Sequence, residues 1–407
     1  MTSKTHFSYK MIYSSICEHC FLSLKPFNKW RKDFIKDVLW LILSIHGKIN
    51  FLQLSRYGKF GEQHYRRQFE KDFDFLGFNT SLVKEYCGKR KVLAFDPSYL
   101  PKSGKHTPGT GYFWSGCAGR SQWGLEIGEI AAIDLDNHTA LHLEAQQTIA
   151  SEDKTLLDIY ADTLSSRSKQ LKEISDILVV DGYFSKEPFV GKMKKVGLKV
   201  VSRFRDDARL QYILTPKKTG KKGRPKTNGG KVDKEHLNRD FFSLVEQENA
   251  DFLIYTAQVK AVALKQVVKV VIVQDRKKEK NTKIYFSTDL EMEAMEILEI
   301  YNSRFQIEFL FRDAKEYTGL TSCQARDEKK LDFHFNIALS AINIAKVAHW
   351  YNLPKDQRNT FSMKNIKIIN HNALLLERFF SMFAVNPNLI KNSQNVKELL
   401  LYGTLCA

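Results

Sequence analysis

The sequence predicts an α/β fold: a mixed sheet that carries a β-rich insertion, with helical regions towards both ends of the chain. Two observations predict it. Short apolar runs at 92–95 and 177–180 alternate with amphipathic helical patterns, as is typical of buried strands covered by helices. The stretch at 205–286 is rich in β-branched and aromatic residues, which favour strands. We therefore expect an α/β domain that the β-rich stretch interrupts.

Composition narrows the class of protein. The chain has 407 residues, of which 43% are hydrophobic, so it can bury the cores of two or three domains. Its 63 Lys and Arg residues against 46 Asp and Glu residues give a formal net charge of +17, which favours nucleic acid as a partner over a membrane. Six scattered cysteines, no signal peptide and no apolar run long enough to span a bilayer indicate a cytoplasmic, DNA-associated protein.

Residues 1–88 form an N-terminal helical region. Apolar periodicity predicts helices at 28–46, 50–57 and 62–75, and the last of these carries Arg66 and Arg67 on its polar face. Two interpretations stay open. In the first, the three helices form a helix-turn-helix unit that binds DNA through these arginines. In the second, they form a plain helical bundle whose basic face is exposed to solvent.

Two of the predicted strands end in a carboxylate. Asp96 follows the apolar run at 92–95, and Asp181 follows the run at 177–180. If the strands are parallel neighbours, both side chains lie at the same edge of the sheet, where open α/β proteins build their sites. Two carboxylates that close together need a cation between them, and carboxylate oxygens suit Mg²⁺ or Mn²⁺.

The other patterns of this region complete a layered α/β arrangement. In chain order they predict strands at 124–136 and 139–146, a helix at 151–174 that starts at Ser151, a helix at 186–196 and a strand at 199–202.

A basic loop lies inside the β-rich insertion. Lys221, Lys222 and Arg224 stand among further lysines, glycines and prolines, a composition typical of a flexible segment. We expect this loop to contact DNA without reading sequence, with an unspecific solvated loop as the alternative.

The stretch at 300–317 predicts one helix with a polar stripe. At about 100° per residue, Tyr301, Arg304, Glu308 and Lys315 fall on one narrow face. The alternative for these residues is an ordinary surface ion pair between Arg304 and Glu308. Helical patterns at 331–350, 363–383 and 395–401 follow and predict a helical platform that packs on the sheet.

Taken together, three sequence features resemble a known family. Asp96, the run Asp181-Gly-Tyr-Phe184, and the spacing Tyr301-x2-Arg304-x3-Glu308-x6-Lys315 are similar to the signatures of DDE transposases of bacterial cut-and-paste insertion sequences, the family numbered four. The resemblance covers residues 91–349 and implies an RNase H-like catalytic domain. It divides the chain into an N-terminal region (1–88), a first part of the core (89–204), the insertion (205–286), a second part of the core (287–350) and a C-terminal helical region (351–407).

The resemblance also implies roles for residues. Asp96, Asp181 and Glu308 would be the acidic triad that holds two divalent ions, Mg²⁺ or Mn²⁺. Tyr301, Arg304 and Lys315 would grip DNA phosphates. The implied activity is binding of terminal inverted repeats, metal-dependent strand cleavage and strand transfer into target DNA, through hairpin ends. The implied assembly is a homodimer bridged by double-stranded DNA.

One departure from the family concerns base flipping. Some relatives flip a base onto a tryptophan of the β insertion, and none of the five tryptophans here lies in that region. Tyr255, Tyr285 and Phe286 are the candidates for that role. Two other functions stay open: an RNase H-like structure-specific endonuclease, and a catalytically silent DNA-binding repressor derived from a transposase.

Overall fold

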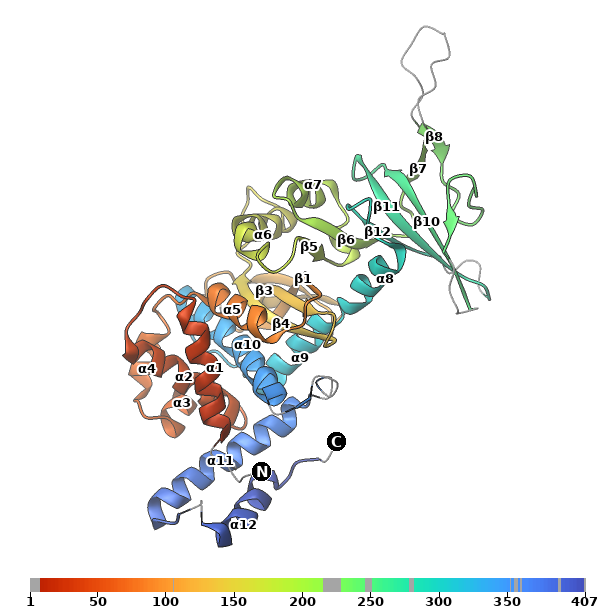
Figure 1. Cartoon of the computed structure of the whole chain (residues 1–407). Helices are drawn as coiled ribbons and strands as arrows, with labels where there is room; N and C mark the ends of the chain where they lie inside the picture. The colour runs from red at the N-terminus through yellow and green to blue at the C-terminus, as the bar shows by residue number, and fades with distance from the viewer. Residues whose placement is uncertain are drawn as a thin grey trace, which may run out of the picture. The chain divides into compact units, whose positions relative to one another are not determined.

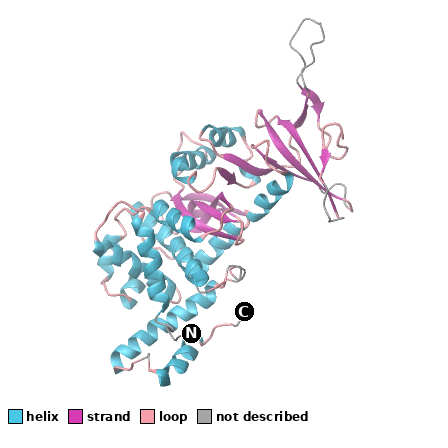
Figure 2. Ribbon diagram, viewed as in Figure 1, coloured by secondary structure: helices cyan, strands magenta, loops and turns pink. Residues whose placement is uncertain are grey.

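The computed structural model describes residues 8–104, 106–214, 228–245, 251–277, 282–351, 353–354, 358, 361–386 and 389–405. The chain divides into two compact units. Unit 1 comprises Met1–Arg90, Pro97–Ile149 and Gln306–Ala407, and unit 2 comprises Lys91–Asp96 and Ala150–Phe305. The chain is mixed α/β, with helices and a large, mostly antiparallel sheet, so the predicted class is confirmed at that level (Figure 2).

The parallel part of unit 2 holds the two apolar runs. Of strand β1 (Lys91–Pro101), the residues Lys91–Asp96 belong to this unit. Strand β1 pairs in parallel with β5 (Ile177–Val179), which pairs in parallel with β6 (Lys199–Phe204). Helices α6 (Leu156–Leu171) and α7 (Glu187–Lys195) pack against each other (Figure 1). The helix expected from Ser151 begins later, because Thr155 and Asp158 form a capping box.

The antiparallel part of unit 2 follows in the order β6, β12, β11, β10, β7, β8, with β9 paired to β10. These strands are β7 (Leu210–Ile213), β8 (Asn228–Lys231), β9 (Ser243–Leu244), β10 (Phe252–Ala261), β11 (Gln266–Asp275) and β12 (Thr282–Ser287). The described part of the stretch that the composition marked as β-rich does contain these six strands. The predicted DNA-contacting residues Lys221, Lys222 and Arg224 lie outside the described residues.

Unit 1 is built around a long buried helix. Helix α10 (Glu328–Tyr351) is buried along nearly its whole length and packs on α1, α2, α5 and strand β4. The other elements of this unit are α1 (Ser8–Leu22), α2 (Lys29–Ser44), α3 (Phe51–Tyr57), α4 (Glu62–Gln68), α5 (Phe75–Tyr86), β2 (Gly111–Ser115), β3 (Arg120–Asp134), β4 (Thr139–Gln147), α9 (Gln306–Tyr317), α11 (Met363–Phe383) and α12 (Ile390–Leu401). In the described part of the chain, no helix combines the length and the apolar character needed to cross a membrane.

The helix predicted at 62–75 is shorter than expected, because a buried arginine satisfies the carbonyl groups at its end. The guanidinium of Arg31 donates to the carbonyls of Gln68 and Lys71, both at 2.9 Å. The carboxylate of Asp74 then accepts from the backbone N–H of Gly77 and begins α5. The prediction of one continuous helix was therefore wrong.

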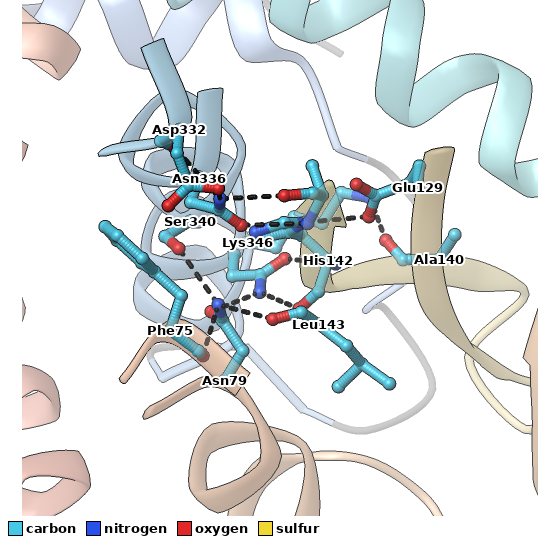
Figure 3. A network of polar contacts seen from close by, with 12 residues as sticks. Phe75, Asn79, Glu129, Ala140, His142, Leu143, Asp332, Asn336, Ser340 and Lys346 are labelled. Atoms are coloured by element: carbon cyan, nitrogen blue, oxygen red, sulfur yellow. Dashed lines mark hydrogen bonds and ion pairs between the residues drawn. The ribbon is translucent and has the colours of Figure 1, made fainter. Parts of the chain in front are cut away.

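Two asparagines of α10 complete the hydrogen bonding of strand β4 (Figure 3). Asn343 accepts from the backbone N–H of His142 at 2.9 Å and donates to the carbonyl of the same residue at 2.7 Å. Asn336 does the same for Ala145, at 2.8 and 2.9 Å. Among the described strands, β4 pairs with β3 alone, so the amide groups take the place of a second neighbouring strand.

A buried lysine gives unit 1 a pH-dependent stability. Lys367 is 4% exposed and donates to the carbonyls of Ile42 and Ile45 at the end of α2. Burial lowers the pKa of Lys367 to about 7. The unfolded chain keeps this proton up to a pH above 10, so burying the lysine costs folding free energy, about 5 kcal/mol below pH 7.

The free energy of unfolding should therefore rise between pH 7 and pH 10, and Lys367→Met should reduce that rise. The part that remains belongs to Lys346, another buried lysine of unit 1, whose pKa burial lowers to about 8. Urea unfolding of both proteins across this range measures it. The matched control is Lys364→Met on the exposed side of α11, which should keep the wild-type slope. Parallel curves for the wild type and Lys367→Met would contradict this reading of the lysine.

Candidate active site

The parallel pairing of β1 with β5 brings Asp96 and Asp181 to one edge of the unit 2 sheet. Leu93 pairs with Leu178 and Ala94 pairs with Val179, so each aspartate lies two residues beyond the last matched pair. Both side chains are partly exposed. The condition that the two strands be parallel neighbours is therefore met, and its consequence is two carboxylates at adjacent strand ends.

Aromatic packing fixes the two strand ends beneath the carboxylates. The ring of Phe95, next to Asp96, lies 5.7 Å from the ring of Phe184 and 5.6 Å from that of Tyr160. All three rings are buried. Phe184 closes the short 3-10 helix η1 (Gly182–Phe184) that begins at Asp181, so the same cluster anchors the segments on both sides of the site.

Tyr301 is the hydrogen-bond partner of the Asp181 carboxylate. Its hydroxyl donates to Oδ1 of Asp181 at 3.3 Å, and its ring packs 5.0 Å from the ring of Tyr285. Burial, followed by the charge of Asp181, raises the pKa of Tyr301 to about 12, so the hydroxyl keeps its proton and acts as a donor. The backbone carbonyl of Asp181 accepts from the hydroxyl of Ser202 at 3.1 Å.

Gly182 allows η1 to approach strand β6 closely. A Cβ atom at this position would lie 3.3 Å from both Cγ and the carbonyl oxygen of Arg203. A larger residue here would therefore need Arg203 to move by a few tenths of an ångström.

A groove of about 600 Å³ opens beside Asp181 within unit 2. Tyr183 and Lys186 line one part of it, and the ammonium of Lys186 lies 4.2 Å from the centre of the Tyr183 ring. The charged residues that line the groove are Lys186, Arg203, Arg205 and Lys283, which are basic, and Asp181, Asp206 and Asp207, which are acidic. The excess of basic side chains suits a phosphate-bearing strand that runs past the carboxylates.

Helix 300–317, expected as one piece, is two helices. Helix α8 (Ala294–Ser303) has Glu293 as its N-cap and Arg304 as its C-cap, and α9 starts at Gln306. The hydroxyl of Ser303 donates to the carbonyl of Ile300, the acceptor that the N–H of Arg304 would use in a continuous helix. That N–H bonds to the carbonyl of Tyr301 instead.

The four residues of the predicted polar stripe are divided between the two units. Tyr301 and Arg304 belong to unit 2, where the guanidinium of Arg304 lies 5.9 Å from the centre of the Tyr301 ring. Glu308 and Lys315 belong to unit 1, where they are seven residues apart and share the partly exposed face of α9.

Lys315 ties helix α9 to strand β1 within unit 1. Its ammonium donates to the hydroxyl of Ser98 at 2.8 Å and to the carbonyl of Tyr99 at 3.1 Å. Ser98 lies two residues after Asp96 in the same strand. The residue expected to grip DNA thus also fastens the helix that carries Glu308.

The arginines of the N-terminal region have different surroundings. Arg66 pairs with Glu62 at 2.5 Å and stacks over Phe51, while Arg67 is exposed. Of these two, Arg67 has the more accessible charge for a phosphate.

The carboxylates at the strand ends fit a divalent cation by chemistry. Asp96 and Asp181 offer oxygen ligands at adjacent, partly exposed positions, the donor type that Mg²⁺ and Mn²⁺ prefer. Over the described ranges, His, Cys, Asp and Glu side chains do not gather in threes as a ready metal-ligand group. The third predicted ligand, Glu308, belongs to unit 1.

Sequence reasoning missed the basic residues of the groove. Arg203 and Arg205 stand at the carboxyl end of β6, which is parallel to β5, so they lie at the same edge of the sheet as Asp181. The predicted strand at 199–202, followed by two arginines, already held that signal. Lys283 lies much later in the chain, in strand β12, so its position beside the groove could not be predicted from the sequence.

Comparison with known proteins identifies the family of this chain. No curated protein matches the chain. The family model described as a transposase DDE domain matches residues 89–344, which cover both strand-end aspartates and helices α8 and α9. The chain belongs to the transposase DDE domain family.

Proposed function

We propose that this protein is a cut-and-paste transposase with an RNase H-like catalytic core. The observation that carries the proposal is the register of β1 and β5, which brings Asp96 and Asp181 to neighbouring strand ends inside the stretch that the family model matches. Family membership supports a nuclease or strand transferase that acts on DNA. The five-region division made from the sequence is part of this proposal.

In this proposal Asp96, Asp181 and Glu308 hold the divalent ions, Mg²⁺ or Mn²⁺. Such ions, when bound, activate the attacking oxygen and stabilise the leaving oxygen at phosphorus. The other residues position the reactants. Tyr301 orients the Asp181 carboxylate through its hydrogen bond, and Lys186 and Arg203 guide the DNA strand along the groove.

The finer steps rest on the resemblance. They are recognition of terminal inverted repeats, nicking, hairpin formation, joining to target DNA and assembly as a DNA-bridged homodimer. Arg304, Lys315 and Arg67 are the proposed additional phosphate contacts, and the basic segment with Lys221, Lys222 and Arg224 is another.

The test is strand cleavage of the DNA that flanks the gene of this protein, with Mg²⁺, with Mn²⁺ and with chelator. We expect discrete metal-dependent cuts at a pair of inverted repeats, followed by joining of the cut ends to a second duplex. Binding to those ends without cleavage would favour the repressor, and cuts confined to branched DNA would favour the structure-specific endonuclease.

Tyr301→Phe tests whether this hydroxyl positions the carboxylate. The phenylalanine keeps the packing against Tyr285 and loses only the hydrogen bond to Asp181. Cleavage should slow about ten-fold and need more metal ion for half-maximal rate, while DNA affinity stays unchanged. A Tyr301→Phe enzyme with the wild-type metal requirement but weaker DNA binding would point to the phosphate-gripping role alone.

A further inference from the structure

The hairpin of β2 and β3 in unit 1 exposes three large aromatic side chains on one face. Tyr112, Trp114 and Trp123 are 73%, 63% and 40% exposed, while Phe113 between the first two is buried. Alternation along β2 puts Tyr112 and Trp114 on the same side. Tyr112 is the cross-strand partner of Trp123, with ring centroids 5.4 Å apart.

Local contacts hold this face in place. The hydroxyl of Tyr99 donates to the carbonyl of Trp123 at 2.8 Å, and the indole N–H of Trp123 donates to the carbonyl of Gly104 at 3.4 Å. Trp114 stands opposite the small residue Ser121 on β3.

The three residues of the β insertion that the sequence offered for stacking a base are buried. Tyr255, Tyr285 and Phe286 are 4%, 8% and 0% exposed, because their rings face the interior of unit 2. A ring that is covered on both sides offers no surface to a nucleobase. The expectation that one of these three stacks a base was therefore wrong for the described fold.

We propose that Tyr112, Trp114 and Trp123 form an aromatic surface that stacks unpaired bases of DNA. The large exposed apolar side chains of the hairpin are all aromatic, which suits bases rather than an aliphatic protein interface. Residues 111–124 include Arg120 and no acidic residue, so their charge suits a phosphate backbone. The inference rests on the proposed function to the extent that strand cleavage and joining create unpaired nucleotides.

The experiment measures binding of the full-length protein to three labelled probes: oligothymidylate, an abasic strand of the same length and a duplex. Trp114→Ala should lose about ten-fold in affinity for oligothymidylate and keep the wild-type affinity for the abasic strand and the duplex. Trp114→Tyr should restore the affinity for oligothymidylate that Trp114→Ala loses. Trp114→Leu should not restore it, because leucine keeps apolar area but has no aromatic face. Tyr402→Ala, which removes an aromatic ring that is 78% exposed elsewhere in unit 1, is the matched control.

Equal losses on all three probes would overturn the proposal, as would restoration by leucine or a change in oligomeric mass in Trp114→Ala. The outcome is independent of catalysis. If the protein discriminates oligothymidylate through Trp114 but cleaves no DNA, the aromatic surface stands and the proposed transposase activity fails. If it cleaves its ends with full rate and Trp114→Ala binds oligothymidylate as well as wild type, the aromatic surface fails.

Discussion

Asp181→Asn is expected to abolish DNA strand cleavage, with a loss of at least a thousand-fold in rate, while leaving DNA affinity within about two-fold. The substitution keeps the size of the side chain and its oxygen acceptor for Tyr301, and removes the negative charge that a divalent cation needs. Gel-based cleavage of end DNA, with filter binding on the same duplex, measures both quantities.

The same strand supplies the matched control. Asp176 stands just before β5, at the end opposite Asp181, where it pairs with Lys199 at 3.2 Å. Asp176→Asn changes the charge equally and should leave cleavage near the wild-type rate. If both variants cleave DNA at the wild-type rate, cleavage does not need the Asp181 carboxylate. If both lose DNA binding, the loss comes from the change in net surface charge.

Asn343→Ala is expected to lower the free energy of unfolding by about 3 kcal/mol or more. The change removes an amide that satisfies both the N–H and the carbonyl of His142 and also donates to Oδ1 of Asn79. All of these groups are buried, so water cannot replace the amide, and each unsatisfied group costs about 1–3 kcal/mol. Urea unfolding monitored by circular dichroism measures the change.

Asn395→Ala is the control for this prediction. Asn395 is an exposed asparagine of α12, so its replacement should change the free energy by about 0.5 kcal/mol or less. A loss in Asn343→Ala no larger than in this control would mean that β4 does not depend on the amide groups of α10.

The sequence predicted the elements whose patterns are local. The apolar runs ending at Asp96 and Asp181 are strands, and their parallel pairing follows from the general behaviour of such α/β units. Helix α11 begins and ends at the predicted residues because Ser362 caps it and its apolar periodicity is regular. The metal-binding roles of the site residues, and the division into five regions, stay predictions.

What could not be predicted depends on single contacts between distant residues. The expected helix is interrupted after α8, where the N–H groups of Arg304 and Phe305 bond to carbonyls three residues back instead of four. Arg31 binds the carbonyl of Gln68, the last residue of α4, from 37 residues away. The asparagines of α10 look like ordinary polar interruptions of an apolar helix until β4 is beside them. The groove beside Asp181 needs β6 and β12 to be neighbours, a pairing of residues far apart in the chain.

We infer that Asp96, Asp181 and Glu308 act on the same divalent ions. Electron paramagnetic resonance titration of Mn²⁺ into the protein bound to its cleaved-end duplex tests this inference, using wild type, Asp96→Asn, Asp181→Asn and Glu308→Gln. Each of the three variants should lose tight Mn²⁺ binding while still binding the duplex. Wild-type Mn²⁺ binding in Glu308→Gln, alongside its loss in both aspartate variants, would remove Glu308 from the metal site and overturn the inference.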